Sequence, residues 1–592
     1  MSRTSPPRAD PPTARGPFWG GVIDDSPSGT AQGGTIGEWD LVLGQEVGRV
    51  RASELFVRCL ENEGVRYVFG LPGEEALPLV DAIASSSLSF ITTRHEQGAA
   101  FMADVYGRLT GRAGVCLSTL GPGATNLVTG VADANLDMAP LVAVAGQAPT
   151  SRLHKQSHQV VDLVRLYEPV VKFGVQVHSP QTIPEIVRKA FKLAESETPG
   201  ACFIEFPQDV AEMAAPEGRP LPRETIPPAF PNPQAVAKAA AIIEAAQAPL
   251  VMAGHGVARR GASDQLVAFA EELGLPVVTT FMAKGTIPAS HPLHLGAAGL
   301  QANDYSYCGF KEADVIVCAG FDMVEYQPHL WRRPEHKVIH IHVTPAEIDE
   351  SYAVDCEVVG DIGATLDALR QACQRGKSHF STRPRHDLLV EIAQHADDQG
   401  FPVKPQKIVS DLRQALDPDD IVVCDVGAHK LWMARLYQAA RPNTCLMSNG
   451  FAAMGIAVPG AVAAALVCPG RRVVAVTGDG GFLLNSQELE TAVRLGLDLV
   501  VLIWSDASYG LIGWKQTCAL GHTTCVDFSN PDFVMYAQSF GAFGQRIEKS
   551  ADLLPALQAA VRRRGVTVID CPVDYRENLA LTERLGSLVC TD

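Results

Sequence analysis

Residues 472–506, RVVAVTGDGGFLLNSQELETAVRLGLDLVVLIWSD, contain the pattern that decides the fold. Two apolar runs, Arg472–Thr477 and Leu499–Trp504, predict β-strands. Glycines follow the first run, and Asn485–Glu488 predicts a capping box that opens a helix ending near Gly496. A strand, a glycine loop, a helix and a second strand form a right-handed crossover, so we expect two parallel, neighbouring strands.

An aspartate stands at the carboxyl end of each predicted strand. Asp479 lies between Gly478 and Gly480, and Asp506 follows the second strand. The carboxyl ends of parallel strands meet at one edge of a sheet, so we expect the two carboxylates to face each other there. Small glycines let a phosphate approach the backbone, and carboxylate and phosphate oxygens suit the octahedral coordination of Mg²⁺. The pattern predicts a magnesium diphosphate site.

Composition limits the class of protein. The chain has 592 residues, enough for three to four domains, and its hydrophobic content of 46% is that of a globular protein. A net charge of −17 argues against nucleic acid and anionic membranes as partners. Fourteen scattered cysteines without a C-x-x-C pair predict reduced thiols in a cytoplasmic protein, with a disulfide framework as the less favoured alternative.

Alternation of short apolar runs with helical patterns predicts an α/β chain of three consecutive doubly wound parallel-sheet domains, which suggests a distant internal duplication. The expected segments are a disordered tail (1–45), a first domain (46–215), a linker (216–233), a middle domain (234–374), a second linker (375–400) and a third domain (401–592). The other apolar runs are Tyr67–Phe69, Phe90–Thr92, Val115–Leu117, Leu141–Ala145, Leu250–Ala253, Val277–Thr279, Val315–Cys318, Val338–Val343 and Ile421–Cys424.

Glu96 follows a predicted strand and precedes a helical pattern over Gly98–Leu109. Apolar neighbours would partly desolvate its carboxyl group, which makes it a candidate proton donor. The alternative is that Glu96 only caps the amino end of the helix, where acidic side chains are favoured. The nearby turn Leu120–Asn126 either presents N–H groups to an anion or is an ordinary connection.

The third domain offers two further candidates. Asp425–His429 follows a predicted strand, and Met454 falls in a predicted small-residue helix before Pro459. A methionine among alanines also suits a core, and His429 also suits a structural role. In the middle domain, Gly254-His255-Gly256 lacks the third glycine of a dinucleotide motif. Zinc spacing and a serine nucleophile elbow are both missing from the sequence.

Together these motifs resemble the thiamine diphosphate-dependent acetohydroxyacid synthase and pyruvate oxidase superfamily. The resemblance runs from about Arg51 to Gly586 and keeps the family's order: the glutamate motif, a central domain, then the G-D-G motif. It implies pyrimidine-binding, central and pyrophosphate-binding domains. Asp506, the pair His158-Gln159 and the segment Asp574–Asn578 are most similar to the catabolic acetolactate synthases.

The resemblance also implies roles for residues. Glu96 would hydrogen-bond the aminopyrimidine of thiamine diphosphate and promote loss of the C2 proton, and Met454 would wedge the cofactor into a bent shape. Gln159 is a candidate catalytic contact to the substrate, and Gln147 is a lesser one. The other implied cofactor ligands are Val426, Gly427, His429, Gly478, Gly480, Gly481 and Tyr509, and the implied Mg²⁺ ligands are Asp479, Asp506 and Ser508.

The implied activity is an acetolactate synthase-like transferase that decarboxylates pyruvate and joins the two-carbon unit to a second 2-keto acid. The alternatives are a pyruvate oxidase-like enzyme with FAD, another thiamine diphosphate-dependent decarboxylase or lyase, and a non-catalytic homologue. Gly320–Met323 departs from the pattern of flavin-bearing synthases, so FAD is possible but not favoured. The family implies a homodimer or homotetramer, with the cofactor between the first domain of one subunit and the third domain of another.

Overall fold

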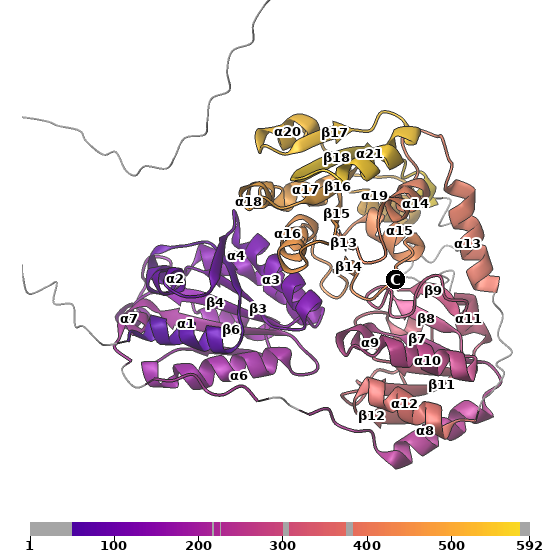
Figure 1. Cartoon of the computed structure of the whole chain (residues 1–592), viewed down its shortest axis with the longest axis horizontal. Helices are drawn as coiled ribbons and strands as arrows, with labels where there is room; N and C mark the ends of the chain where they lie inside the picture. The colour runs from indigo at the N-terminus through magenta and orange to yellow at the C-terminus, as the bar shows by residue number, and fades with distance from the viewer. Residues whose placement is uncertain (1–49, 216–217, 225–226, 300–306, 375–382, 580–592) are drawn as a thin grey trace, which may run out of the picture. The chain divides into compact units, whose positions relative to one another are not determined.

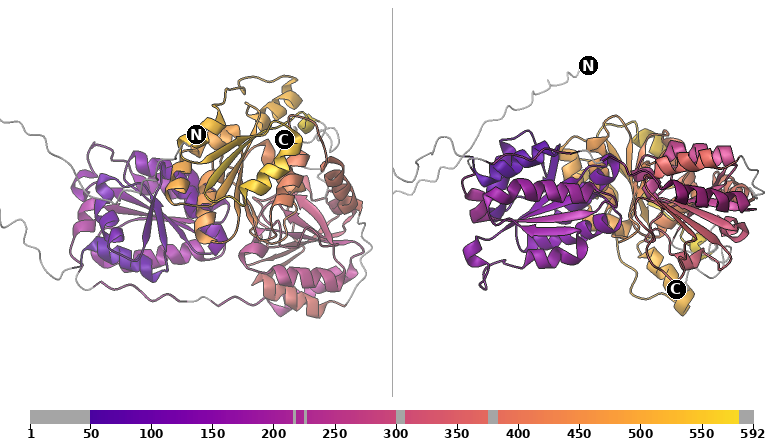
Figure 2. Two further views of the ribbon diagram at one scale, coloured as in Figure 1. Left: turned by 45° about the horizontal axis from the view of Figure 1, so that its top comes forward. Right: turned by 90° about the horizontal axis from the view of Figure 1, so that it is seen from below.

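The structure, a computed structural model, describes residues 50–215, 218–224, 227–299, 307–374 and 383–579. These residues form three six-stranded sheets in which neighbouring strands are parallel, with helices on both faces (Figures 1 and 2). The predicted α/β class with three doubly wound sheets is therefore confirmed. The predicted tail lies outside the described residues. Among the described helices, none has the length and apolar character needed to cross a membrane.

The first sheet has the strand order β2-β1-β3-β4-β6-β5. Its strands are β1 (Tyr67–Gly70), β2 (Ser89–Thr92), β3 (Gly114–Ser118), β4 (Leu141–Gln147), β5 (Phe173–Gln176) and β6 (Ala201–Pro207). Its helices are α1 (Ala52–Asn62), α2 (Leu77–Ala84), α3 (Glu96–Thr110), α4 (Pro122–Leu136), α5 (Leu163–Tyr167), α6 (Ile183–Glu195) and α7 (Gln208–Glu212). One face of the sheet packs on α1 and α6 and the other on α3 and α4 (Figure 1).

The third sheet repeats that topology, with the order β14-β13-β15-β16-β18-β17. Its strands are β13 (Ile421–Cys424), β14 (Cys445–Met447), β15 (Val473–Gly478), β16 (Leu499–Ser505), β17 (Phe543–Arg546) and β18 (Val566–Pro572). Its helices are α14 (Pro405–Ala415), α15 (Ala428–Leu436), α16 (Ala457–Val467), α17 (Asp479–Asn485), α18 (Glu488–Arg494), α19 (Gly510–Leu520), α20 (Phe533–Ser539) and α21 (Leu553–Ala560). The predicted strands of residues 472–506 are β15 and β16, and they are parallel neighbours as expected.

The middle sheet has a different order, β12-β11-β10-β7-β8-β9, which is the order of dinucleotide-binding folds. Its strands are β7 (Pro249–Ala253), β8 (Val277–Thr280), β9 (His294–Ala298), β10 (Val315–Ala319), β11 (Lys337–His342) and β12 (Cys356–Val359). Its helices are α8 (Pro233–Ala245), α9 (His255–Arg259), α10 (Ser263–Leu273), α11 (Tyr307–Glu312), α12 (Ile362–Ala372) and α13 (Arg383–His395). The segment predicted as the second linker thus contains a helix, α13.

The predicted capping box at Asn485–Glu488 is wrong. A helix does begin at this segment and end close to Gly496, namely α18, but its N-cap residue Gln487 makes no side-chain capping bond. Asn485 is the last residue of the preceding short helix α17, and Glu488 is the first residue of α18. The Glu488 carboxylate instead accepts hydrogen bonds from the N–H groups of Arg94 and His95 in the first domain. Those N–H groups stand at the amino end of α3, where the helix itself offers no acceptor, so an acid from another element satisfies them.

Most of the described cysteines are free and buried. Among the described residues, eleven cysteines have free thiols, and nine of these are buried. Cys518 differs, because it is disulfide-bonded. The expectation of reduced core cysteines therefore holds for most of the described thiols, and Cys518 is the exception.

Candidate active site

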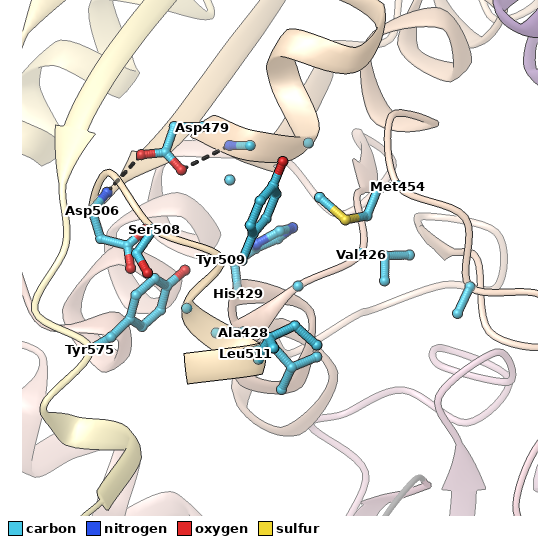
Figure 3. A pocket seen from close by; sticks show the side chains of 17 residues that line it. Val426, Ala428, His429, Met454, Asp479, Asp506, Ser508, Tyr509, Leu511 and Tyr575 are labelled. Atoms are coloured by element: carbon cyan, nitrogen blue, oxygen red, sulfur yellow. Dashed lines mark hydrogen bonds between the residues drawn. The ribbon is translucent and has the colours of Figure 1, made fainter. Parts of the chain in front are cut away.

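A pocket of about 260 Å³ opens at the carboxyl ends of β13, β15 and β16. The order of the sheet reverses between β13 and β15, and such a crevice is where open α/β sheets bind ligands. Every cofactor and metal ligand expected from the sequence, apart from Glu96, lines this pocket: Val426, Gly427, His429, Met454, Gly478, Asp479, Gly480, Gly481, Asp506, Ser508 and Tyr509. Figure 3 shows the side chains of Val426, His429, Met454, Asp479, Asp506, Ser508 and Tyr509 around the cavity.

Glycines line the pocket at positions where a side chain would clash with its walls. A Cβ at Gly480 would lie 2.9 Å from the Tyr509 ring, and one at Gly427 would lie 2.8 Å from the His429 ring. A Cβ at Gly481 would lie 3.1 Å from the Asp425 carboxyl carbon. Side chains at these positions would displace the pocket walls, so glycine keeps the loops after β13 and β15 close to the cavity.

The carboxyl groups of Asp479 and Asp506 lie at one end of the pocket (Figure 3). Asp479 Oδ2 accepts hydrogen bonds from the N–H groups of Asp506 and Ala507 at 2.9 and 2.7 Å, and from Asn530 Nδ2 at 2.7 Å. Burial and the nearby Asp479 carboxylate raise the pKa of Asp506 to about 7. Two carboxylates held this close repel each other, a cost that a cation between them would relieve.

Met454 and His429 form other parts of the wall (Figure 3). Met454 lies in the turn before α16 and not inside a helix, so the predicted helix at that position begins three residues later. The turn is held by the residue that follows β13, because Asp425 Oδ1 accepts a hydrogen bond from the N–H group of Gly455 at 2.8 Å. Burial lowers the pKa of His429 to about 3, so its ring is neutral at physiological pH.

Glu96 and Gln159 do not line this pocket. Glu96 is buried at the start of α3, and its Oε2 accepts a hydrogen bond from Asn126 Nδ2 at 3.0 Å. Gln159 is exposed and lies over Gly121, in the turn that leads into α4. The two candidates therefore belong to the same part of the first domain, because Glu96 lies beside Gly123 and Gln159 beside Gly121.

Gln147 does not suit the substrate contact suggested for it. Its side chain is buried, and its amide nitrogen donates to Glu205 Oε1 at 2.6 Å and to the Val161 carbonyl at 3.1 Å. Its amide oxygen accepts from the N–H group of Ala148 at 2.9 Å. All of the amide's polar atoms are thus used inside the fold.

Sequence reasoning missed several residues of the site. Asn126 and Asn530 orient the two key acids. Asn126 ends the turn noted at Leu120–Asn126, but no contact to Glu96 was assigned to it, and no local motif marks Asn530. Tyr575 also lines the pocket, and the only signal for it was its place in Asp574–Asn578. The remaining unpredicted lining residues are Ala428, Ala452, Gly510, Leu511 and Ile512.

The chain is similar in sequence to known proteins along most of its length. Residues 50–166 match the N-terminal TPP binding domain of thiamine pyrophosphate enzymes, residues 236–369 match their central domain, and residues 425–571 match their C-terminal TPP binding domain. The chain is also 37% identical over 543 residues to the acetolactate synthase of Bacillus subtilis (strain 168), which covers 90% of this chain and 94% of that protein. The chain belongs to the thiamine pyrophosphate enzyme family.

Two other relatives in this family have related names. The catabolic acetolactate synthase of Raoultella terrigena is 36% identical over 556 residues, covering 90% of this chain and 97% of that protein. A probable acetolactate synthase large subunit of Methanocaldococcus jannaschii is 35% identical over 560 residues, covering 91% and 94%. The pocket lies within the match to the C-terminal TPP binding domain, and Glu96 lies within the match to the N-terminal one.

The residues of the pocket fit thiamine pyrophosphate (thiamine diphosphate) with a divalent cation. The bare glycine loop accommodates a diphosphate, and the two carboxylates supply oxygen ligands that Mg²⁺ prefers. In the part of the chain that the structure describes, no three acidic, histidine or cysteine side chains lie together as a complete metal site. Backbone, diphosphate and water oxygens would therefore complete the coordination.

Proposed function

We propose that this protein is an acetolactate synthase that converts two molecules of pyruvate into 2-acetolactate and carbon dioxide. One carbon–carbon bond breaks when the first pyruvate loses carbon dioxide, and one forms to the keto carbon of the second pyruvate. The reaction balances without an oxidant. The observation that supports the proposal is the gathering of Asp479, Asp506 and Met454 around a glycine-lined crevice, in a chain whose relatives have that name.

Each residue then has a task. Thiamine diphosphate supplies the electron sink when it is bound. Asp479 and Asp506 would hold its Mg²⁺, and the glycine loop would hold its diphosphate. Met454 would support the bent shape of the cofactor, and Glu96 would hold a proton at the pyrimidine ring. The neutral His429 would add no charge beside the diphosphate.

We also propose that the site is completed between two subunits, in a homodimer or a homotetramer. Glu96 is absent from the pocket of its own chain, so a second chain would have to supply it. The segments around the pocket carry exposed apolar side chains, namely Phe451, Leu483, Leu484, Tyr509 and Ile512. Apolar surface of this kind marks a protein interface, and a partner's first domain would cover it.

A pyruvate oxidase-like enzyme with FAD is the second candidate, because the middle sheet has the dinucleotide-binding strand order. Its crevice, between β7 and β10, does not suit a diphosphate. The carboxyl group of Glu325 occupies it, and its Oε1 accepts hydrogen bonds from the N–H groups of His255 and Asp322 at 3.0 Å. A Cβ at Gly254 would lie 2.4 Å from the Gly320 carbonyl, so the two loops already touch. We therefore propose an enzyme without a flavin.

The test is to incubate the pure protein with pyruvate, Mg²⁺ and thiamine diphosphate, and to identify the products and record the visible spectrum. We expect acetolactate, a colourless protein and a loss of at least about a hundredfold in kcat for Glu96→Gln. Glu185→Gln is the matched control, because it changes an exposed acid in the first turn of another helix of the same domain. A yellow protein that makes no acetolactate would favour the oxidase, and cofactor binding without decarboxylation would favour a non-catalytic homologue.

A further inference from the structure

The turn that carries Glu96 is held from the third domain. Glu488 Oε1 accepts hydrogen bonds from the N–H groups of Arg94 at 3.0 Å and of His95 at 3.1 Å. Asn485 Nδ2 donates to Gln97 Oε1 at 3.1 Å. Acceptors and donors of the α17–α18 break therefore contact the residues immediately before and after Glu96.

Glu488 is suited to hold this turn. Its side chain is fully buried, and its second oxygen accepts a hydrogen bond from Thr491 Oγ1 at 2.6 Å. Gly98 leaves room for the carboxylate, because a Cβ there would lie 2.7 Å from Glu488 Oε1.

Glu96 is thereby fixed at two points. Asn126 binds its carboxylate, and Glu488 fixes the backbone of the two residues that precede it. The free end of a glutamate lies several bonds from its Cα, so a small shift of this turn moves the carboxylate by a comparable or larger distance. A displacement of about 1 Å at a reacting group costs about a hundredfold in rate.

We propose that Glu488 is a positioning residue for Glu96, and that it acts through the hydrogen bonds of its carboxylate to the 94–95 backbone. The proposal rests on the proposed function, in which Glu96 activates the cofactor. The helix α17 runs from Asp479 to Asn485, so one short helix joins the metal end of the pocket to this turn. Each chain would thus order, through its own third domain, the Glu96 that it supplies to its partner.

The first experiment uses the cofactor-free protein. We expect Glu488→Ala to speed backbone hydrogen exchange in peptides covering residues 92–98 by at least about tenfold. Glu488→Gln should stay near the wild-type rate, since its amide oxygen can accept both N–H groups. Glu490→Gln is the matched control, because it removes a charge from the same helix at a side chain that bonds Arg494. Unchanged exchange in Glu488→Ala would overturn the proposal.

The second experiment measures exchange of the cofactor's C2 proton for deuterium in each variant saturated with Mg²⁺ and thiamine diphosphate. We expect at least about a tenfold loss in Glu488→Ala, little loss in Glu488→Gln and an unchanged cofactor dissociation constant in both. Equal losses in both variants would overturn a hydrogen-bonding role. Because no pyruvate is used, failure of the acetolactate assignment does not affect this result, whereas wild-type exchange in Glu96→Gln would count against the role of Glu96 itself.

Gly98→Ala keeps the proposal testable if Glu488→Ala does not fold. The added Cβ would push against Glu488 Oε1 and leave the rest of the turn chemically unchanged. We expect the same faster backbone exchange at residues 92–98 and the same slower C2 exchange. A Gly98→Ala protein with wild-type values for both would contradict the proposal.

Discussion

The side chain of Glu96 depends on one amide in the next helix. Asn126 Nδ2 donates to Glu96 Oε2 at 3.0 Å, and a Cβ at Gly123 would lie 3.3 Å from Glu96 Oε1. An amide donor orients a carboxylate without adding a charge beside it. Asn126 therefore leaves the other oxygen of Glu96 for a partner outside the chain.

We expect Asn126→Ala to lower kcat for acetolactate formation about tenfold, because an unoriented carboxylate spends less time in a productive position. The dissociation constant of the magnesium cofactor complex should stay within about twofold of wild type, because the pocket lies elsewhere in the chain. Steady-state kinetics and cofactor titration check both values. Thr125→Ala, which removes a hydroxyl bonded to Pro122, is the control. A weakened cofactor affinity with normal kcat would contradict this role for Asn126.

At the residue scale, the sequence marks acids that stand within a few positions after an apolar run. Asp479, Asp506 and Glu96 each stand at the carboxyl end of a predicted strand, so their placement at a sheet edge followed from local pattern. Asn126 and Asn530 were not predictable, because they reach their acids from helices and loops far along the chain. Their amides have no periodicity or spacing that distinguishes them from other polar residues.

At the element scale, strand positions followed from the apolar runs, whereas capping did not. The apolar runs of residues 472–506 form β15 and β16. The side chains of Asn485 and Glu488, however, bond residues at the amino end of α3 instead of the amino end of α18. Capping boxes are assigned from neighbouring residues only. A buried acid between two packed domains accepts hydrogen bonds from nearby N–H groups that have no other acceptor. Which N–H groups these are depends on tertiary packing and cannot be assigned from neighbouring residues.

Glu325, in the crevice of the middle sheet, should make the free energy of unfolding fall as the pH rises. Burial and the nearby Asp322 raise the pKa of Glu325 to about 8, so the folded protein holds a proton there that the unfolded chain releases. Stability is then full below the ordinary glutamate pKa and falls as pH rises through about 8. We expect Glu325→Gln to remove this loss, which for a pKa raised from 4.5 to about 8 is on the order of 4 kcal/mol between pH 5 and pH 9.

Urea unfolding at pH 5 and pH 9 measures the effect, with the cofactor-free protein. The variant should match wild type at pH 5 and exceed it at pH 9, because a neutral amide can accept the same N–H groups of His255 and Asp322. Glu335→Gln, an exposed glutamate of the same domain, is the control and should change neither value. Parallel stability curves for wild type and Glu325→Gln would contradict the prediction.

At the scale of the whole molecule, the three α/β units were predictable from the sequence, but the strand order within each sheet and the packing between the units were not. The first and third sheets share one strand order, and the middle sheet has another. The apolar runs alone do not separate these orders, because strand order depends on which crossovers turn back across the sheet. Likewise, α3, α4 and α16 contribute to one apolar core that spans the first and third domains. The sequence of each helix indicates only that one of its sides is buried, and does not indicate which other helix covers that side.

A site shared between subunits makes a prediction about mixed oligomers. We expect Glu96→Gln and Asp479→Ala to be inactive alone, since each removes one half of every site. A dimer that pairs the two variants keeps one intact site, with Glu96 from one chain and Asp479 from the other. Co-expression with two affinity tags and purification through both should give about half of wild-type activity per dimer.

The converse pairing makes the experiment decisive. A chain that carries both substitutions, paired with a wild-type chain, has no intact site if Glu96 acts in the partner's pocket, because each site then lacks either its glutamate or its aspartate. The same dimer keeps about half of its activity if both residues act within one chain. We expect the doubly substituted pairing to be inactive and the split pairing to be active, because Glu96 does not line the pocket that contains Asp479 in its own chain. The opposite pattern would place the whole site in a single subunit.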